Sequence, residues 1–525
     1  MKNTHSSGIL FPKSEKFPQR TLTPYYKLED DDAHSPASAH SMWGLDSVAI
    51  PVTYICTGLL FSVPNTSIEY FSRKMGASDS QLATINVVRA LPWTIKVVFG
   101  ILPDLLPISG MRFKPYMVLG YLISSFFYYV LSSYEESALS VELFTFLLAG
   151  AMVGIVMVDV MGDALVASRV LNNQETYTGD SQSTAYLCRY LSEMVGFWWG
   201  AIMFSDTSLW SVHLSTSRIF AFLAVLPFLL AFPFLYTLVE PKVVGVSPFK
   251  DQMMQIWAVL QTGACWSVIR YIVLFNACMV HNSAWGNYLK VAYRFSAFQY
   301  GAMTAMGATV TFIAIYIHRQ CLAHRVGTTL RALYVTSSII FSVFSLCNVL
   351  LVFGWNEILH IPPFWFAMGD HIAMHCARGI QTLPQAMLFV THCPVGQEGV
   401  SFAFLTGYSN LANLFSHTIS NIFLRLWPVE LDNLQAGDFD GVWKLSLLSS
   451  LISSLPLLFT HKLLPADSDQ LLQLFNEHSP KRGIMMLVGF AFALVWVVVL
   501  SVLAILRPCS ILVGGKGCFG DGAVP

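Results

Sequence analysis

Long apolar segments are the feature that most constrains how this chain folds. There are thirteen of them, each of about 20 to 30 residues, and a membrane-spanning helix needs about 20 apolar residues. They cover residues 46–71, 82–103, 115–134, 142–168, 184–205, 217–239, 264–288, 297–318, 330–353, 362–391, 399–427, 441–464 and 483–506. Only 12% of the residues are charged and 54% are hydrophobic, whereas soluble domains carry about 25% charged residues. The sequence therefore predicts an all-α polytopic membrane protein.

The loops and the N-terminal region indicate an orientation. Residues 1–45 are polar and contain the acidic run 29–32. With no apolar segment before this run, a cleavable signal is not indicated, and the acidic residues argue against a transit peptide. We expect 1–45 to be a disordered cytoplasmic tail. Lys and Arg gather in the loops on the same side as this tail, as at Arg112, Lys242 and Arg325. This bias predicts a cytoplasmic N-terminus, and the plasma membrane is favoured over an organelle.

A long polar connection divides the chain. Residues 240–263 form the longest polar loop between apolar segments, and we expect this loop in the cytoplasm between two six-helix bundles, 46–239 and 264–464. That layout is typical of the major-facilitator fold, with a substrate site between the halves near the middle of the membrane. Residues 465–525 then supply a linker, an extra transmembrane helix (483–506) and a short tail. In this region Cys509 and Cys518 either form a disulfide or remain free thiols, and the sequence does not decide between the two.

The stretch from Arg89 to Tyr116 places cations inside an apolar segment. Arg89 and Lys96 are seven residues apart and share a helix face. A charge facing lipid costs several kcal/mol, so both are expected to face a cavity or the protein interior. The connector that follows carries Asp104 and Arg112, which we expect to form a charged pair at a tight cytoplasmic turn. The alternative is an ordinary helix pair in which Lys96 reaches the membrane interface.

The fourth and fifth segments carry further charges at helical spacing. Asp159 and Asp163 are four residues apart, and two carboxylates this close resist joint ionisation, which suits a proton carrier. The alternative is that Asp163 pairs with Arg169 near the helix end. Arg189 and Glu193 are also four apart. They either form a structural pair or act as a switch, because breaking a buried pair exposes an uncompensated charge.

The tenth segment combines Asp370, His371, His375 and Arg378. The two histidines and the arginine form one stripe at i, i+4 and i+7. A zinc site is disfavoured, because there is no HExxH motif and no third ligand, so no metal is expected. Protonatable histidines lining a cavity are the preferred interpretation. Arg270, in the seventh segment, either joins this cavity or reaches the membrane interface.

Charges of both signs inside the spans suit a substrate that carries carboxylates and a polar ring. Five tryptophans are candidates for stacking on such a ring: Trp93, Trp198, Trp199, Trp266 and Trp285. There is no GxSxG motif, no Walker loop and no dinucleotide motif. The sequence therefore predicts a transporter and not an enzyme, with no cofactor, driven by an ion or substrate gradient. The net charge of −1 gives no sign of a nucleic-acid partner.

Four stretches carry a family resemblance. The first contains Pro92-Trp93-x-x-Lys96-x-x-x-Gly100-x-x-x-Asp104, then Pro107-Ile108-x-Gly110-x-Arg112 and Pro115-Tyr116. The others are Asp163-Ala-Leu-Val166-Ala-Ser-Arg169, then Gly179-Asp180-Ser-Gln182-Ser183 with Arg189 and Gly196, and finally Leu383-Pro384 with Cys393-Pro394-x-x-x-Glu398-Gly399-x-x-Phe402-Ala403 and Asn410. This pattern resembles the folate–biopterin transporter family of the major facilitator superfamily, over about 46–464. It departs from the family at Ser168, where members commonly have Glu, and in a thinner basic cluster around Arg112.

The resemblance implies import of a folate- or pteridine-type solute. We interpret the chain as a proton symporter that works by alternating access, as a monomer in the lipid bilayer. The expected substrate-binding residues are Lys96, Asp163, Arg189, Glu193 and Arg378. The expected proton-coupling residues are Asp159, Asp163 and Asp370, and the expected gating residues are Asp104 and Arg112.

Two other functions compete with this interpretation. A major-facilitator transporter of another metabolite, such as S-adenosylmethionine or an amino acid, fits the same fold. A receptor or scaffold that transports nothing belongs to a different class, and it explains the charges inside the spans poorly.

Overall fold

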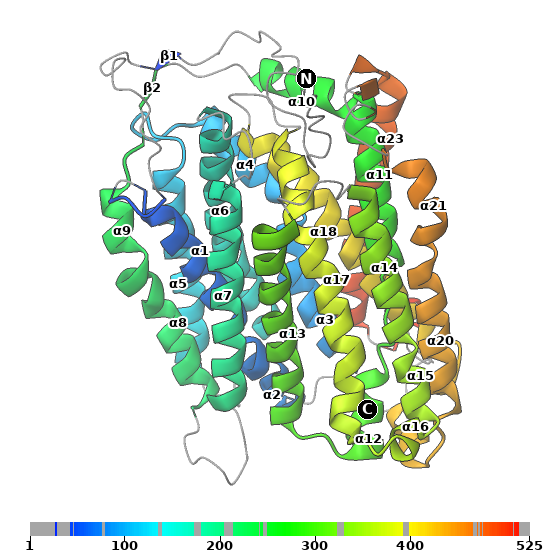
Figure 1. Ribbon diagram of the computed structural model, residues 1–525. Coiled ribbons are helices and arrows are strands. Elements are labelled where there is room, and N and C mark those ends of the chain that lie inside the picture. Colours follow the sequence, from blue (N-terminus) through cyan, green and yellow to red (C-terminus); the bar gives the residue numbers. More distant parts are fainter. Residues whose placement is uncertain are drawn as a thin grey trace.

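The chain forms a bundle of helices that run side by side (Figure 1). The computed structural model describes residues 27–28, 42–45, 47–75, 79–134, 139–172, 180–203, 214–240, 242–244, 249–322, 330–391, 398–465, 470, 473–474, 476–507 and 509–513. In this part of the chain the only strands are β1 (Lys27–Leu28) and β2 (Val243–Val244), which pair antiparallel. Most of the expected N-terminal tail lies outside the described residues. The prediction of an all-α protein is confirmed, with this one short ribbon added.

Figure 1 shows the first half in blue to teal and the second half in green to orange. The first half contains α1 (Ala49–Ser62), α2 (Asn65–Lys74), α3 (Asp79–Ala90), η2 (Leu91–Trp93), α4 (Lys96–Leu105), α5 (Lys114–Ser133), α6 (Val141–Asn172), α7 (Asp180–Met203), α8 (Thr216–Leu230) and α9 (Phe232–Thr237). After α10 (Phe249–Leu260), the second half contains α11 (Gly263–Cys278), α12 (Trp285–Tyr293), α13 (Ala297–Ile317), η3 (His318–Leu322), α14 (Leu330–Ser345), α15 (Cys347–Val352), α16 (Trp355–Ile358), α17 (Pro363–Thr391), α18 (Glu398–Phe423), α19 (Leu431–Gln435), α20 (Asp440–Ser454) and α21 (Pro456–Leu463). The chain then forms α23 (Pro480–Leu506) and η4 (Ile511–Val513).

Eight helices in the described residues are long and apolar enough to cross a membrane, and α11 is a shorter apolar helix. The seventh expected span, 264–288, was wrong in extent. Its helix ends at Cys278, and a second helix begins only at Trp285. The tenth span, 362–391, is the single helix α17.

A break in the second transmembrane segment positions part of the site. Pro92 lies in the first turn of η2, and the backbone leaves helical geometry at Ile95 before α4 begins. The freed carbonyl of Trp93 accepts a hydrogen bond from Asn410 Nδ2 of α18, at 3.3 Å. Gly407 permits this approach, because a Cβ there would lie 2.8 Å from the Thr94 carbonyl oxygen.

The two halves meet along two seams. In one seam α7 packs against α13, and Trp198 Nε1 donates to Thr309 Oγ1 at 3.0 Å. Close packing there also needs Gly301, where a Cβ would lie 2.8 Å from that of Ala201. In the other seam α3, η2 and α4 pack against α18. The space between the seams holds the candidate site.

Candidate substrate site

A cavity of about 390 Å³ lies between the two halves. Helices α1, α4 and α7 and the break at η2 supply its wall in the first half. Helices α11, α13, α17 and α18 supply the wall in the second half. Its volume is within the range of pockets that bind small metabolites.

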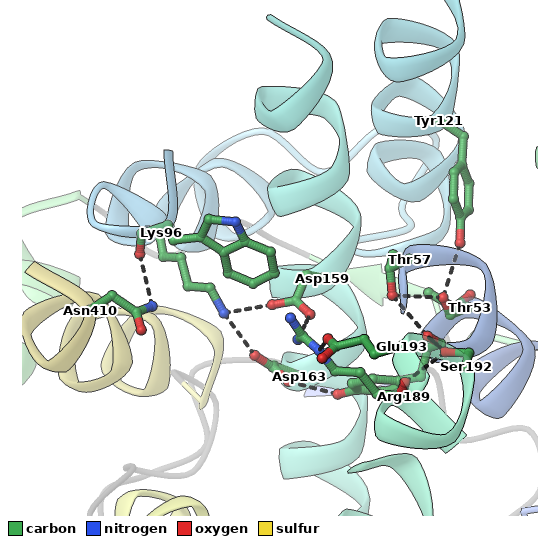
Figure 2. Close-up of polar contacts among 12 residues, drawn as sticks. Thr53, Thr57, Lys96, Tyr121, Asp159, Asp163, Arg189, Ser192, Glu193 and Asn410 are labelled. Carbon is green, nitrogen blue, oxygen red and sulfur yellow. Dashed lines mark hydrogen bonds and ion pairs between the residues drawn. The ribbon is translucent and has the colours of Figure 1, made fainter. Parts of the chain in front are cut away.

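Lys96 is buried in the first-half wall beside two carboxylates. Its Nζ lies 2.5 Å from Asp159 Oδ2 and 3.3 Å from Asp163 Oδ2 (Figure 2). The three side chains are at most 5% exposed. The interpretation of Lys96 as an interfacial cation is therefore wrong, since the ammonium points into the protein.

Arg189 extends the same network toward the cavity. Its Nε lies 2.9 Å from Glu193 Oε1, and its Nη1 pairs with Asp159 Oδ1. Tyr54 Oη donates to Asp163 Oδ1 at 2.7 Å. Asp163 thus has partners on α1 and α4, while the side chain of Arg169, its alternative partner, lies outside the described residues. We call Lys96, Asp159, Asp163, Arg189 and Glu193 the charge network.

The charge network contains one more carboxylate than cations. Lys96 and Arg189 supply two positive charges, and Asp159, Asp163 and Glu193 supply three negative charges when all are ionised. An uncompensated charge is costly in a buried site. One proton, or one positive group of a ligand, would balance the network.

Trp93 lies between the two cations of the network. The Lys96 Nζ and the Arg189 Cζ are each 4.7 Å from its ring centroid. The ring lines the cavity, and its buried Nε1 has no hydrogen-bond partner among the described residues. Of the five candidate stacking tryptophans, Trp93 lines the cavity, whereas Trp198 bonds across a seam and Trp266 lies under Arg270.

Arg378 lines the opposite wall of the cavity, on α17. It forms no ion pair with any side chain in the described part of the chain. Arg378 is half-buried, and a cation partly removed from water without a carboxylate is costly. The cavity therefore presents a positive group on the wall opposite the negatively biased network.

The predicted histidine stripe is present beside Arg378. His371 and His375 have ring centroids 4.7 Å apart, and His375 Nδ1 lies 3.1 Å from Thr311 Oγ1. A second pair, His281 and His417, has centroids 4.6 Å apart. The described residues contain no group of three or more His, Cys, Asp or Glu side chains that could hold a metal. The side chain of Asp370 lies outside the described residues.

Amide side chains of the second half complete the cavity and were missed by the sequence reasoning. Asn276, Gln385 and Asn413 line it. Gln385 Nε2 and Asn276 Nδ2 donate to Ser409 Oγ at 2.9 and 2.8 Å, whereas the buried Asn413 Oδ1 has no partner among the described residues. Amides inside apolar segments were a usable signal, because they are costly in lipid unless they face polar groups.

The expected gating pair lies outside the cavity. Arg112 Nε donates to Asp104 Oδ1 at 2.8 Å and joins α4 to the turn before α5. Both residues belong to the first half. Glu240, which sequence reasoning missed, accepts hydrogen bonds from the backbone N–H groups of Arg112, Phe113 and Lys114 at 2.6 to 2.8 Å. The pair and Glu240 together fix this turn against the end of α9.

Comparison with known proteins identifies the family. Residues 60–477 match the BT1 family. The chain belongs to the BT1 family. It is 25% identical to the probable folate-biopterin transporter 2 of Arabidopsis thaliana, over 80% of this chain and 83% of that protein. It is 23% identical to the folate-biopterin transporter of Synechocystis sp. (81% and 82%) and to folate transporter 1 of Plasmodium falciparum (76% and 76%).

Solved structures show the fold of this BT1 family member. The nucleoside transporter NupG (D323A mutant) superposes with a TM-score of 0.55 at 10% identity, over 80% of this chain and 100% of that one. The human organic anion transporter MFSD10 gives a TM-score of 0.50 at 14% identity, over 79% and 99%. The resemblance noted in the sequence and the major-facilitator fold are confirmed. The relatives are transporters, so the prediction of a transporter and not an enzyme is confirmed as well.

Proposed function

We propose that this protein carries a folate- or pteridine-type solute across a membrane by alternating access, in symport with protons. The named functions of the relatives support the cargo class. The proposal depends mainly on one observation, namely that the two walls of the cavity carry charges of opposite sign. An ion-paired network with one excess carboxylate faces Arg378, which has no carboxylate partner among the described residues.

A folate-type cargo matches each wall. The carboxylate of its glutamate tail would pair with Arg378, which relieves the cost of an uncompensated cation. The amino-pyrimidine edge offers N–H donors that Glu193 accepts. The pterin ring would stack on Trp93, and the partnerless Trp93 Nε1 and Asn413 Oδ1 are a donor and an acceptor for ligand atoms.

Proton coupling follows from the charge balance of the network. When the cavity is empty, one proton balances three carboxylates against two cations. We assign this proton to the Asp159–Asp163 pair, with Asp163 as the group that gains and loses it. Asp370 remains a predicted member of the proton path, and Asp104 with Arg112 remains the predicted gate. Import at the plasma membrane by a monomer completes the proposal.

Uptake by purified protein in lipid vesicles tests the proposal. Labelled folate, biopterin, S-adenosylmethionine and an amino acid would each be offered with and without an inward proton gradient. We expect accumulation of folate and biopterin that rises with the gradient and collapses with a protonophore. Uptake of S-adenosylmethionine alone would show that the cargo is this metabolite and not a folate or pteridine. Absence of all uptake would favour a receptor or scaffold.

A further inference from the structure

Helix α23 lies beyond the part of the chain that matches the BT1 family. The match ends at residue 477, and α23 begins at Pro480. Of the eight candidate spans in the described residues it is the most apolar and has the lowest buried share, 22%. Most of its surface is thus available to lipid, while a narrow face packs on the protein. That face determines what the helix does.

The start of α23 is fixed to the second half by backbone pairing. Gly263 N donates to the Glu477 carbonyl at 2.8 Å, and Ser479 N donates to the Gln261 carbonyl at 3.0 Å. Close packing against α10 follows at Gly483, where a Cβ would lie 2.7 Å from the Trp257 ring. The first turn of α23 is therefore tied to the segment between α10 and α11.

The middle of α23 packs on α18, also in the second half. The Phe490 ring lies 5.5 Å from Phe404 and 5.4 Å from Tyr408, between centroids. Further along, Trp496 Nε1 donates to Thr418 Oγ1 at 3.0 Å. These contacts follow α18 over several turns, so α23 and α18 are expected to move together.

The same helix also contacts α3 of the first half. Val497 is fully buried in a cluster with Val87 of α3 and with Leu411 and Leu414 of α18. Toward the membrane face opposite the α4–α5 turn, Gln81 Nε2 lies 3.5 Å from the Ile505 carbonyl oxygen. This distance is at the limit for a hydrogen bond. The Val497 cluster gives α23 an apolar contact with α3, a kind of contact that permits sliding.

We propose that α23 is a strap across the seam between α3 and α18, which moves with the second half and slides against α3 as this seam opens at its Gln81–Ile505 end. The reason is that its contacts differ on the two sides. The backbone pairing at Gly263 and Ser479 and the Trp496–Thr418 hydrogen bond are made to the second half, whereas the Val497 cluster that includes α3 is apolar. This inference rests on the alternating access of the proposed function, but it is independent of the cargo.

Two cross-links between pairs of introduced cysteines, made with a short bifunctional methanethiosulfonate reagent that spans more than a direct disulfide, test the strap. The pair Gln81→Cys with Ile505→Cys joins α23 to α3 across the seam. The pair Thr418→Cys with Trp496→Cys joins α23 to α18 within the second half and serves as the control. Both are read by folate uptake and by labelling of Met279→Cys, a cavity position, with an impermeant thiol reagent supplied from the Gln81–Ile505 side. Each is measured before and after reduction with dithiothreitol.

We expect the Gln81–Ile505 cross-link to lower uptake and cavity labelling at least tenfold, with recovery on reduction, and the control cross-link to change neither. Labelling that persists in the first cross-linked protein would overturn the strap. Loss of labelling in the control cross-linked protein would also overturn the strap, because it would show that α23 and α18 must move relative to each other. If the reduced protein takes up no folate, the proposed cargo fails, and the labelling still decides the strap.

Discussion

The ammonium of Lys96 and the carboxylate of Asp159 form an ion pair of 2.5 Å inside the first half, where the two side chains are 4% and 0% exposed. Removing one partner of a buried pair leaves the other charge uncompensated and costs about 3–5 kcal/mol. Asp159 also pairs with Arg189, so the loss of Lys96 shifts the whole network toward negative charge. The pair is thus a structural requirement of the cavity wall.

Replacing Lys96 by Met is therefore expected to destabilise the protein strongly. A lower thermal unfolding temperature in detergent is the measurement, and the double variant with Asp159→Asn should recover part of the loss because fewer charges stay unpaired. The matched control is Lys444→Met. Lys444 pairs with Asp440 at the surface, with side chains 35% and 64% exposed, and such pairs contribute about 0–1 kcal/mol. Equal effects at the two lysines would contradict the buried role of Lys96.

The break at η2 gives a second prediction. A Cβ at Gly407 would lie 2.8 Å from the Thr94 carbonyl oxygen, and backbone atoms cannot move aside cheaply. Gly407→Ala should push α18 away from η2, weaken the Asn410–Trp93 hydrogen bond and reduce transport several-fold. Gly286→Ala is the control, since nothing lies within 4 Å of a Cβ there. Wild-type uptake by Gly407→Ala would show that this contact does not position the site.

Glu240 gives a third prediction, at the turn between α4 and α5. Its carboxylate accepts three backbone N–H groups at the start of α5, where negative charge is favourable. Glu240→Ala should cost about 1–2 kcal/mol of stability, by analogy with loss of a helix cap. The measurement is the unfolding temperature, and the control is the exposed Glu357→Ala, which should change it little. A wild-type unfolding temperature for Glu240→Ala would contradict this role.

The sequence predicted charges on helix faces better than it predicted contacts between helices. Spacing alone placed Arg189 beside Glu193, because residues four apart are neighbours on one helix. The pairing of Lys96 with Asp159 joins positions 63 residues apart, and no helical period reports it. The end of α11 at Cys278 was missed because the polar run His281-Asn282-Ser283 was counted inside a single apolar span. Glu240 was missed because its partners are backbone groups, which every residue carries.

The positive wall of the cavity gives a fourth prediction. Arg378→Gln should raise the KM for folate by about 10- to 100-fold, since a hydrogen bond to a charged group contributes about 1.5–3 kcal/mol. Transport of biopterin, which has no glutamate tail, should change little. Arg378→Lys keeps the charge but loses the two-pronged geometry, so partial recovery is expected. Equal losses for both substrates would assign Arg378 to the structure of α17 instead of the cargo carboxylate.

The Asp163→Asn variant provides the strongest test of proton coupling. Asp163→Asn leaves two cations against two carboxylates, so the charge network is balanced without a proton. The amide oxygen still accepts the hydrogen bond from Tyr54, which lies 2.7 Å away in the native protein, and the side-chain shape is preserved. Accumulation driven by an acid outside should then be lost, because no group in the network needs to take up a proton. Exchange of labelled for unlabelled folate at equal pH should persist.

Tyr54→Phe separates coupling from packing at this site. It removes the hydrogen bond to Asp163 but leaves the number of charges unchanged, so acid-driven accumulation should survive with a modest loss of stability. Measuring uptake against the pH difference, together with the amount of folded protein, distinguishes the accounts. Loss of exchange and of folded protein in Asp163→Asn would indicate a fixed structural charge, as expected if Asp163 pairs with Arg169. An unchanged pH dependence with normal uptake would remove Asp163 from the coupling mechanism, because the proton would then be carried elsewhere.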